Sequence, residues 1–399
     1  MTFGTKSLFS TSTHEVVQSS ISQLDATHFV ISYVDVDDSY KVKCVIGVNS
    51  GTTISSYGSE YVAYDGNGYY KTIVKAIDST HFILVYVYSN LGDYFAISVI
   101  GTITNGTEIS FSSPVSIGKL RDATAFGVDV LDSTHIVVVY DKYNEKTTSK
   151  IGTLSSWVVS YGTEVNLTKA SNSSINVVAL DSTHFAIQYR DSNNGYKGYN
   201  VIGVVSGGNS ITYGTEYLYY NGDTRDYSSI AKVDSTHFVN VYTHGSSVYN
   251  IFFNVGVVSN GDDIAYGDEY TLTLGGIGTY IDATYLNSTQ IAVVFKDGSD
   301  SNHGKLILAT LSNGDDLAFS TESAFLGDAA ASYNGVSRIS DTAVSIVFCQ
   351  VGGTGGFAII GQTIVGPANV KTYKGLASAS VKTCKGLAIA SVKTKKGLA

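Results

Sequence analysis

The chain has 399 residues, of which 43% are hydrophobic and 15% are charged, and its formal net charge is −9. This composition excludes a disordered chain and provides the apolar side chains for a large core. Only 2 prolines against 41 glycines and 29 tyrosines, without apolar residues at helical spacing, indicate strands joined by tight turns. We therefore expect an all-β protein.

Three further features limit where the protein works. Cys44, Cys349 and Cys384 are odd in number and widely spaced, which indicates neither a disulfide framework nor a zinc site. No apolar run approaches the roughly 20 residues of a membrane span, and residues 1–7 lack the pattern of a secretory signal. We expect a chain that is made in the cytoplasm and stays there, or leaves by lysis or a dedicated machine. We expect no cofactor, no metal and no membrane partner.

The dominant feature is an internal repeat. A six-residue element of the form Leu-Asp-Ser-Thr-His-Phe occurs seven times, 49 to 54 residues apart, and its last two copies are degenerate. The copies start at Leu24, Ile77, Leu131, Leu180, Val233, Leu286 and Ile339. Two other elements recur with it: an aromatic residue followed by Gly or Ser, as at Tyr57, and a short apolar run broken by a small residue, as at 45–48. Each unit then contains four strand candidates, which in the fourth unit are 162–167, 175–180, 184–190 and 199–205.

Four antiparallel strands at this period are the pattern of a β-propeller blade. The third candidate, 82–86 in the second unit, is apolar on both alternating faces, as a strand between two neighbouring blades requires. The last unit stops after 359–361 without its aromatic–Gly strand, which residues 2–9 are placed to supply. We expect residues 1–366 to form a seven-bladed β-propeller whose ring is closed by the N-terminal strand.

Residues 367–399 are organised differently. The unit V-K-T-x-K-G-L-A recurs three times at a period of 11 residues, with seven lysines and no acidic residue. A glycine in every unit favours short extended pieces joined at Lys-Gly turns over a right-handed coiled coil. All 34 acidic residues belong to the ring, so we expect no nucleic-acid partner. The tail is either a loose solubilising segment or an attachment peptide whose candidate contacts are Lys371, Lys374, Lys382, Lys385 and Lys393.

Titratable residues recur with the repeat, which indicates a structural role. They are His28, His81, His135, His184 and His237, and Glu60, Glu164, Glu216, Glu269 and Glu322. Equivalent positions on a ring lie on a circle and do not converge on one metal ion or catalytic centre. The Asp-Ser/Thr-Thr sequence before each histidine is typical of hairpin turns. We therefore predict no enzyme. Carboxylates from different blades that face each other across the channel would be the arrangement to look for.

Three loops resemble calcium loops in part. They start at Asp35, Asp191 and Asp297 and carry oxygen donors at alternate positions. None has the full loop with a closing bidentate glutamate. Ordinary turns are the favoured interpretation.

Tyrosines flank two polar loops. Tyr64, Tyr69 and Tyr70 surround 65–68, and Tyr219 and Tyr220 precede 221–223. Aromatic faces beside Asn and Asp are typical of sugar-binding sites. Packing between blades is the alternative explanation of the same tyrosines.

The blade motif has no Trp-Asp dipeptide, kelch double glycine or sialidase Asp box. With D-S-T-H-F followed by V-I-G-x-V and Y-G-T-E, it resembles tandem repeats in proteins of phages and environmental bacteria. The tail unit is similar to the K-x-x-x-G-hydrophobic-A repeats at the end of many phage virion proteins. The resemblance implies a non-enzymatic structural or decoration protein on a virion, with the propeller displayed, the tail bound to other virion proteins, and host glycans as further partners. The alternatives are a glycan-binding lectin or adhesin of a bacterial surface and a propeller hydrolase.

Overall fold

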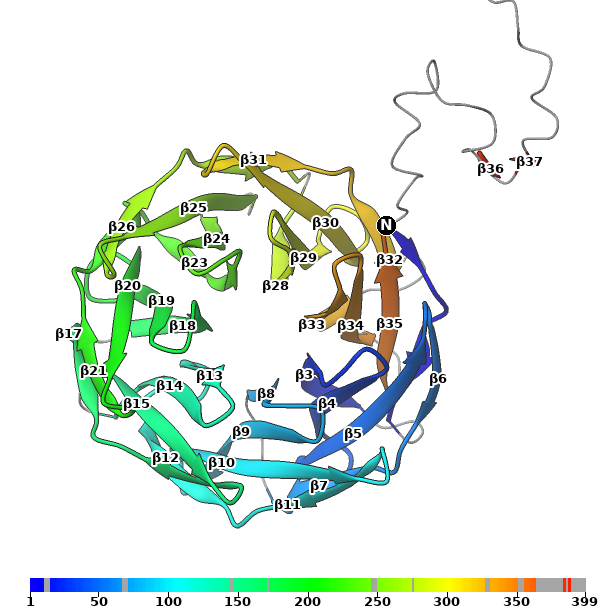
Figure 1. Ribbon diagram of the computed structural model, residues 1–399, viewed down its shortest axis with the longest axis horizontal. Coiled ribbons are helices and arrows are strands. Elements are labelled where there is room, and N and C mark those ends of the chain that lie inside the picture. Colours follow the sequence, from blue (N-terminus) through cyan, green and yellow to red (C-terminus); the bar gives the residue numbers. More distant parts are fainter. Residues whose placement is uncertain are drawn as a thin grey trace, which may run out of the picture.

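The computed structural model describes residues 1–10, 15–66, 71–143, 146–170, 172–244, 250–274, 276–326, 331–350 and 355–363, together with 383–384 and 387–388. Seven antiparallel sheets stand around a common axis (Figure 1). This confirms the all-β, seven-bladed propeller. The predicted tail contacts Lys371, Lys374, Lys382, Lys385 and Lys393 lie outside the described residues.

Every blade repeats one strand order. In the first blade the innermost strand β3 (Val16–Gln23) is followed outward by β4 (His28–Asp35) and β5 (Lys41–Ser50), and β5 pairs with both short outer strands, β6 (Thr53–Tyr57) and β7 (Tyr61–Tyr64). The same order holds for β8 (Thr72–Ala76), β9 (His81–Asn90), β10 (Asp93–Thr104), β11 (Glu108–Phe111) and β12 (Val115–Leu120); for β13 (Phe126–Asp132), β14 (His135–Asp141), β15 (Lys146–Ser155), β16 (Val158–Tyr161) and β17 (Val165–Ala170); and for β18 (Asn172–Ala179), β19 (His184–Asp191), β20 (Lys197–Ser206), β21 (Ser210–Tyr213) and β22 (Tyr217–Tyr220).

The remaining blades follow the same plan. They are β23 (Thr224–Lys232), β24 (His237–His244), β25 (Ile251–Ser259), β26 (Asp263–Tyr266) and β27 (Tyr270–Leu272); β28 (Gly278–Asn287), β29 (Gln290–Asp297), β30 (His303–Ser312), β31 (Asp316–Phe319) and β32 (Ser323–Leu326); and β33 (Ala331–Ser340), β34 (Ala343–Gln350), β35 (Gly356–Gln362), β1 (Thr2–Phe3) and β2 (Ser7–Leu8). Beyond the ring, β36 (Thr383–Cys384) pairs with β37 (Leu387–Ala388).

The outer strand departs from the prediction because it is split at the aromatic–Gly step. The candidate 162–167 begins as a strand only at Val165, in β17, and it belongs to the third blade. The split lies where the hairpin of the next blade touches the strand. A Cβ atom built on Gly162 would stand 3.2 Å from both the Cβ and the carbonyl oxygen of Asn209. Because Gly162 has no side chain, the hairpin of the neighbouring blade can approach the strand closely at this step.

The N-terminus closes the ring, as predicted. Thr2 pairs with Gln362, and Ser7 pairs with Ala358, so β1 and β2 complete the blade of β33, β34 and β35. The N–H of Gly4 also donates to the carbonyl of Ile360 at 2.9 Å. The edge of β35 is thus covered by a segment from the other end of the chain.

The three repeated sequence elements meet in one row of each blade. Phe29 of β4 lies opposite Gly47 of β5, which lies opposite Tyr57 of β6. A Cβ atom on Gly47 would stand 2.2 Å from Cζ of Phe29, so the glycine makes the space for the ring. The Phe29 and Tyr57 rings pack edge to face with centroids 6.3 Å apart. Equivalent rows are Phe82–Gly101–Phe111, Phe185–Gly203–Tyr213, Phe238–Gly256–Tyr266 and Ile291–Ala309–Phe319.

The second strand of each blade is the centre of the core. Phe82, Ile83, Leu84 and Val85 of β9 are all fully buried, although their side chains point alternately to opposite faces of the sheet. This confirms the prediction that neighbouring blades cover both faces. The described part of the chain contains no helix of the length and apolarity needed to cross a membrane.

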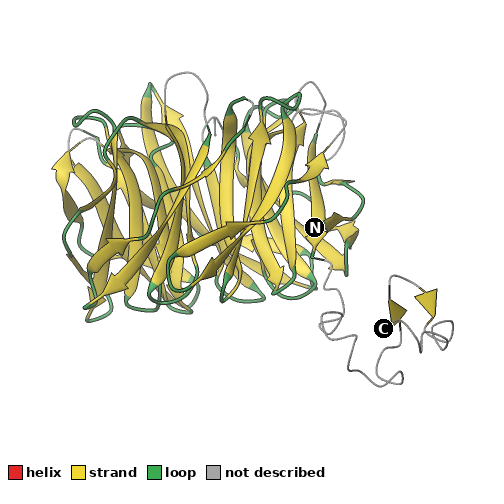
Figure 2. Ribbon diagram, turned by 90° about the horizontal axis from the view of Figure 1, so that it is seen from above, coloured by secondary structure: helices red, strands yellow, loops and turns green. Residues whose placement is uncertain are grey.

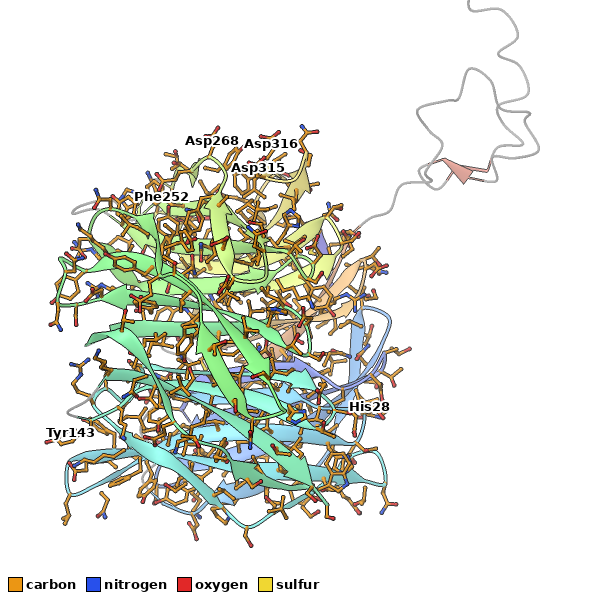
Figure 3. All side chains as sticks on the ribbon, turned by 60° about the vertical axis from the view of Figure 1, so that its left-hand side comes forward. His28, Tyr143, Phe252, Asp268, Asp315 and Asp316 are labelled. Carbon is orange, nitrogen blue, oxygen red and sulfur yellow. The ribbon has the colours of Figure 1, made fainter. Side chains whose placement is uncertain are left out.

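The ring has two faces, seen edge-on in Figure 2. We call the His face the end with the turns between first and second strands, where His28 lies, and the loop face the opposite end, where the loops between second and third strands lie. Figure 3 shows Tyr143 and Phe252 towards the loop face and His28 at the other end. The N–H of Thr363, the last described ring residue, donates to the carbonyl of Thr342 at 2.8 Å, so the chain leaves the ring at the His face.

Candidate functional site

The recurring histidines belong to hairpin turns. In the fourth blade Asp181 accepts hydrogen bonds from the N–H of Thr183 at 2.7 Å, the N–H of His184 at 2.8 Å and the hydroxyl of Thr183 at 2.9 Å. The Nδ1 atom of His184 lies 3.0 Å from the same carboxylate. Partial burial opposes ionisation, but these hydrogen bonds hold the pKa of Asp181 below its ordinary value. The aspartates before His28, His81, His135 and His237 contact those histidines in the same way. Each histidine is therefore engaged by its own turn.

The recurring glutamates lie at the split of the outer strand. Glu164 accepts hydrogen bonds from the hydroxyl of Tyr140 at 2.9 Å and from Nζ of Lys142 at 2.6 Å, and Lys150 Nζ lies 2.9 Å away. Although partial burial opposes it, this set lowers the pKa of Glu164 to about 2. The hydroxyl of Tyr242 donates to Glu269 in the fifth blade. These glutamates tie the outer strand to the second strand of the same blade.

The channel along the ring axis is a polar cavity of about 450 Å³. It is lined by the innermost strands, whose free edges need hydrogen-bond acceptors. Side chains of the preceding blade supply them: the N–H of Ala179 donates to Asp129 at 2.8 Å, and the N–H of Val336 donates to Asp282 at 2.9 Å. Lys75 forms an ion pair with Asp129 at 3.3 Å. Asp129 and Asp282 thus cap the edges of the innermost strands.

Of these two carboxylates, Asp282 lines the cavity, and both Asp282 and Asp129 accept hydrogen bonds from the main chain. A glycosidase-like pair needs one carboxyl that is free to protonate a leaving group and another that faces the same bond. Burial raises the pKa of Asp282, yet its oxygens accept from Val336 N–H and Ser229 Oγ. Burial lowers the pKa of Lys71 to about 8, and its ammonium donates to the carbonyl of Phe126 at 2.7 Å. These bonds favour a structural role for the channel side chains.

The loops considered for calcium are held by other contacts. Lys43 forms ion pairs with Asp35 at 2.7 Å and with Asp38 at 2.8 Å. Asp297 accepts from the N–H and the hydroxyl of Ser299, as in an ordinary Asx turn. Within the described ranges no group of three His, Cys, Asp or Glu side chains is placed to hold a metal ion.

The tyrosines predicted to bind glycans lie at seams between blades. Tyr219 is only 8% exposed and packs on Tyr242 with centroids 5.0 Å apart, which fits the packing alternative. Tyr220 is partly exposed, and its hydroxyl lies 2.9 Å from Nδ1 of His244. Tyr64, also partly exposed, stacks on Tyr86 at 5.2 Å. Tyr69 and Tyr70 lie outside the described residues.

An exposed aromatic group beside this predicted loop is the strongest candidate binding site. Tyr196, between β19 and β20, is 43% exposed and has a left-handed backbone with φ of 59°. The guanidinium of Arg190 lies 4.0 Å from the centre of its ring. Asp223 forms ion pairs with Arg190 at 3.2 Å and with Arg225 at 3.6 Å. We call Tyr196, Arg190, Asp223 and Arg225 the Tyr196 cluster.

The Tyr196 cluster has the chemistry of a sugar contact. An open aromatic ring packs against C–H groups, and the carboxylate and guanidinium groups beside it hydrogen-bond hydroxyl groups. Sequence reasoning found Asp223 in the loop 221–223 but missed Tyr196 and Arg190. The sequence signal for this group is the tyrosine directly after Asn194-Gly195, in one of the loops that resemble calcium loops in part.

Fold and site together define the chain as a seven-bladed β-propeller with polar, aromatic loops on one face. No family model matches the sequence, and no curated protein matches it. A solved structure of a protein of unknown function from Dyadobacter fermentans is similar, with 10% identity over 90% of this chain and 98% of that chain and a TM-score of 0.50. The NanB sialidase of Streptococcus pneumoniae has 9% identity over 89% of this chain and 70% of that chain, with a TM-score of 0.48. The Aleuria aurantia lectin has 12% identity over 79% and 96%, with a TM-score of 0.47. At these identities the likeness concerns the fold alone.

Proposed function

We propose that this propeller is a non-enzymatic glycan-binding protein and that the Tyr196 cluster contacts the sugar. The observation that carries the proposal is an exposed tyrosine ring held in place by a guanidinium, with a carboxylate and a second guanidinium within reach. A sugar ring would pack its C–H groups on the open part of Tyr196. Its hydroxyl groups would donate to Asp223 and accept from Arg225.

The cluster is suited to binding because its parts are ordered before a ligand arrives. Arg190 is buried and joined to both Tyr196 and Asp223. Little side-chain freedom would then be lost on binding, which favours affinity. The titratable groups of the repeats and of the channel are engaged in turns, strand ties and edge caps, and this supports binding in preference to catalysis.

A second proposal concerns attachment to a virion. The chain leaves the ring at the His face, opposite the Tyr196 cluster, and a tail bound to other virion proteins would leave the loop face directed outward. This geometry supports the arrangement expected of a decoration protein made in the host cytoplasm. Removal of residues 367–399 should then abolish incorporation into particles, whereas normal incorporation would refute the attachment role.

The glycan proposal is tested on an array with the purified full chain. Tyr196→Ala and Asp223→Asn should each weaken binding to the recognised glycan at least about tenfold, the loss typical of a central contact residue. Leu91→Ala is the matched control, because Leu91 is a fully exposed apolar side chain in a loop of the same face. A flat array, or equal binding by all variants, would refute the proposal.

A further inference from the structure

One described hairpin on the His face differs from its counterparts, because its loop contains no glycine. The hairpins between third and outer strands in the second, fourth, fifth and sixth blades have loops of three residues, 105–107, 207–209, 260–262 and 313–315. In each of them the second loop residue is a glycine with positive φ: Gly106, Gly208, Gly261 or Gly314. The first and third blades have loops of two residues. In the first blade these are Gly51, which has positive φ, and Thr52. In the third blade they are Ser156 and Trp157, with φ of 50° and 61°.

The shorter loop also lacks a residue that contacts the preceding blade in the longer hairpins. In the longer loops the third residue approaches the aromatic–Gly step of the preceding blade, as Asp262 does at Gly214 with a distance of 2.7 Å to a built Cβ atom. The third-blade loop lacks this residue, and the step before it is Phe111-Ser112 instead of aromatic–Gly. The hairpin of Trp157 therefore lacks both the glycine and the third loop residue of the longer hairpins.

Trp157 lies flat on a histidine that its own turn holds in place. The indole and the ring of His81 are stacked, with centroids 3.3 Å apart and planes inclined by 9°. Nδ1 of His81 lies 3.1 Å from the carboxylate of Asp78, which also accepts from Thr80. The stacking covers His81, whose side chain is 11% exposed against 21% to 28% for its four counterparts.

Packing between blades does not require this tryptophan. Gly106, Gly208 and Gly261 stand over the corresponding histidines of the preceding blades without a side chain. A large side chain rarely adopts the left-handed conformation, so Trp157 is held in a disfavoured backbone state. Such a backbone outlier motivates a functional explanation. Trp157 is the single tryptophan of the chain.

The surface around Trp157 fits a small ligand. Trp157 is 36% exposed and the adjacent Val158 is 52% exposed. Within the described residues its indole N–H has no hydrogen-bond partner, while the carboxylate of Asp78 remains partly exposed nearby. The surface of two exposed apolar residues is far smaller than the roughly 1,200 Å² buried in a stable protein interface, which favours a small ligand over a protein partner.

We propose that Trp157, supported by His81, is a stacking platform for the C–H face of a pyranose sugar on the His face. The indole N–H would donate to a sugar hydroxyl, and Asp78 would accept from another. This site is independent of the Tyr196 cluster, which lies on the opposite face. With both sites, one propeller could contact two glycans, one on each face.

Because Trp157 is the single tryptophan, its fluorescence reports on this site alone. The full chain is titrated with the methyl glycosides of glucose, galactose, mannose and N-acetylglucosamine, and at least one should shift the emission in a saturable manner. Binding is then followed by saturation-transfer NMR in variants. Trp157→Gly, which introduces the glycine of the four longer hairpins, should weaken binding of that glycoside at least tenfold. Tyr196→Ala should leave the fluorescence response unchanged.

Two results would overturn the inference. One is the absence of a spectral change with every glycoside in a chain that is folded by circular dichroism. The other is unchanged binding of the glycoside by Trp157→Gly. Since Trp157→Gly removes a strained residue, its thermal midpoint should be close to that of the wild type, so loss of binding is not confused with unfolding. If Tyr196→Ala loses array binding but keeps the fluorescence response, that result supports the proposed site on the loop face and shows that the Trp157 site is separate from it.

Discussion

The row Phe185–Gly203–Tyr213 allows a quantitative test of how the repeat specifies the blade. Phe185 and Gly203 lie opposite each other on β19 and β20, and a Cβ atom on Gly203 would stand 2.1 Å from Cζ of Phe185. Phe185 is fully buried, and its ring also packs edge to face on Tyr213. The ring therefore has no free space into which to move. We predict that Gly203→Ala destabilises the propeller by about 1–3 kcal/mol, the usual cost of an added methyl group in a packed core.

The sixth blade contains the natural compensation. There Ile291 lies opposite Ala309, so a methyl group on the third strand coincides with a shorter side chain on the second. Phe185→Ile alone should also destabilise the chain, by about 1–3 kcal/mol, because it leaves a cavity beside Gly203. The double variant Phe185→Ile/Gly203→Ala should lose less than the sum of the single variants. A coupling energy of about 1–2 kcal/mol is expected for residues in direct contact.

The measurement is equilibrium unfolding in urea followed by far-ultraviolet circular dichroism, with all four chains under identical conditions. Phe185→Ile/Gly335→Ala is the control pair, because Gly335 lies in the seventh blade and does not contact Phe185. Its effects should add. If Gly203→Ala has no effect on the free energy of unfolding, or if the effects of Phe185→Ile and Gly203→Ala are additive, then the glycine does not recur because it makes space for the phenylalanine ring.

Two further predictions concern the polar contacts. Asp129→Ala leaves the N–H of Ala179 at the edge of β18 without its acceptor, so the free energy of unfolding should fall by about 1–3 kcal/mol. Asp129→Asn keeps an acceptor oxygen and should retain most of the wild-type stability. Equal losses in both variants would contradict the role of Asp129 as an edge cap. The pKa of Glu164 is lowered to about 2 from an ordinary value of 4.5, so its contribution to stability is present above pH 4.5 and is lost as the pH falls towards 2. Thermal midpoints between pH 5 and pH 2 should therefore fall less steeply in Glu164→Gln than in the wild type, and identical slopes would refute the assignment.

Local sequence was sufficient to predict the blades and their number. Asp181, Thr183 and His184 are close in the chain, so their turn can be recognised from composition and order alone. Burial of Phe82–Val85 on both faces could also be predicted, because four successive apolar residues in a strand must cover both sides of a sheet. Closure by residues 2–9 could be predicted because the last repeat lacks a strand that the first residues resemble.

Contacts between repeats could not be obtained in this way. The outer strand is split because Asn209 of the next blade approaches Gly162, and nothing within one repeat shows that approach. Tyr219 and Tyr220 are adjacent in sequence and both contact Tyr242 of the next blade, yet Tyr219 is buried and Tyr220 is partly exposed. The pairing with β20 shifts register at Tyr219, so strict alternation could not predict which ring is covered. Tyr196 and Arg190 meet Asp223, and Trp157 meets His81, only when strands and blades are in place. The repeat period thus determines the ring, whereas the tertiary packing of unequal blades decides which side chains are left exposed to bind a ligand.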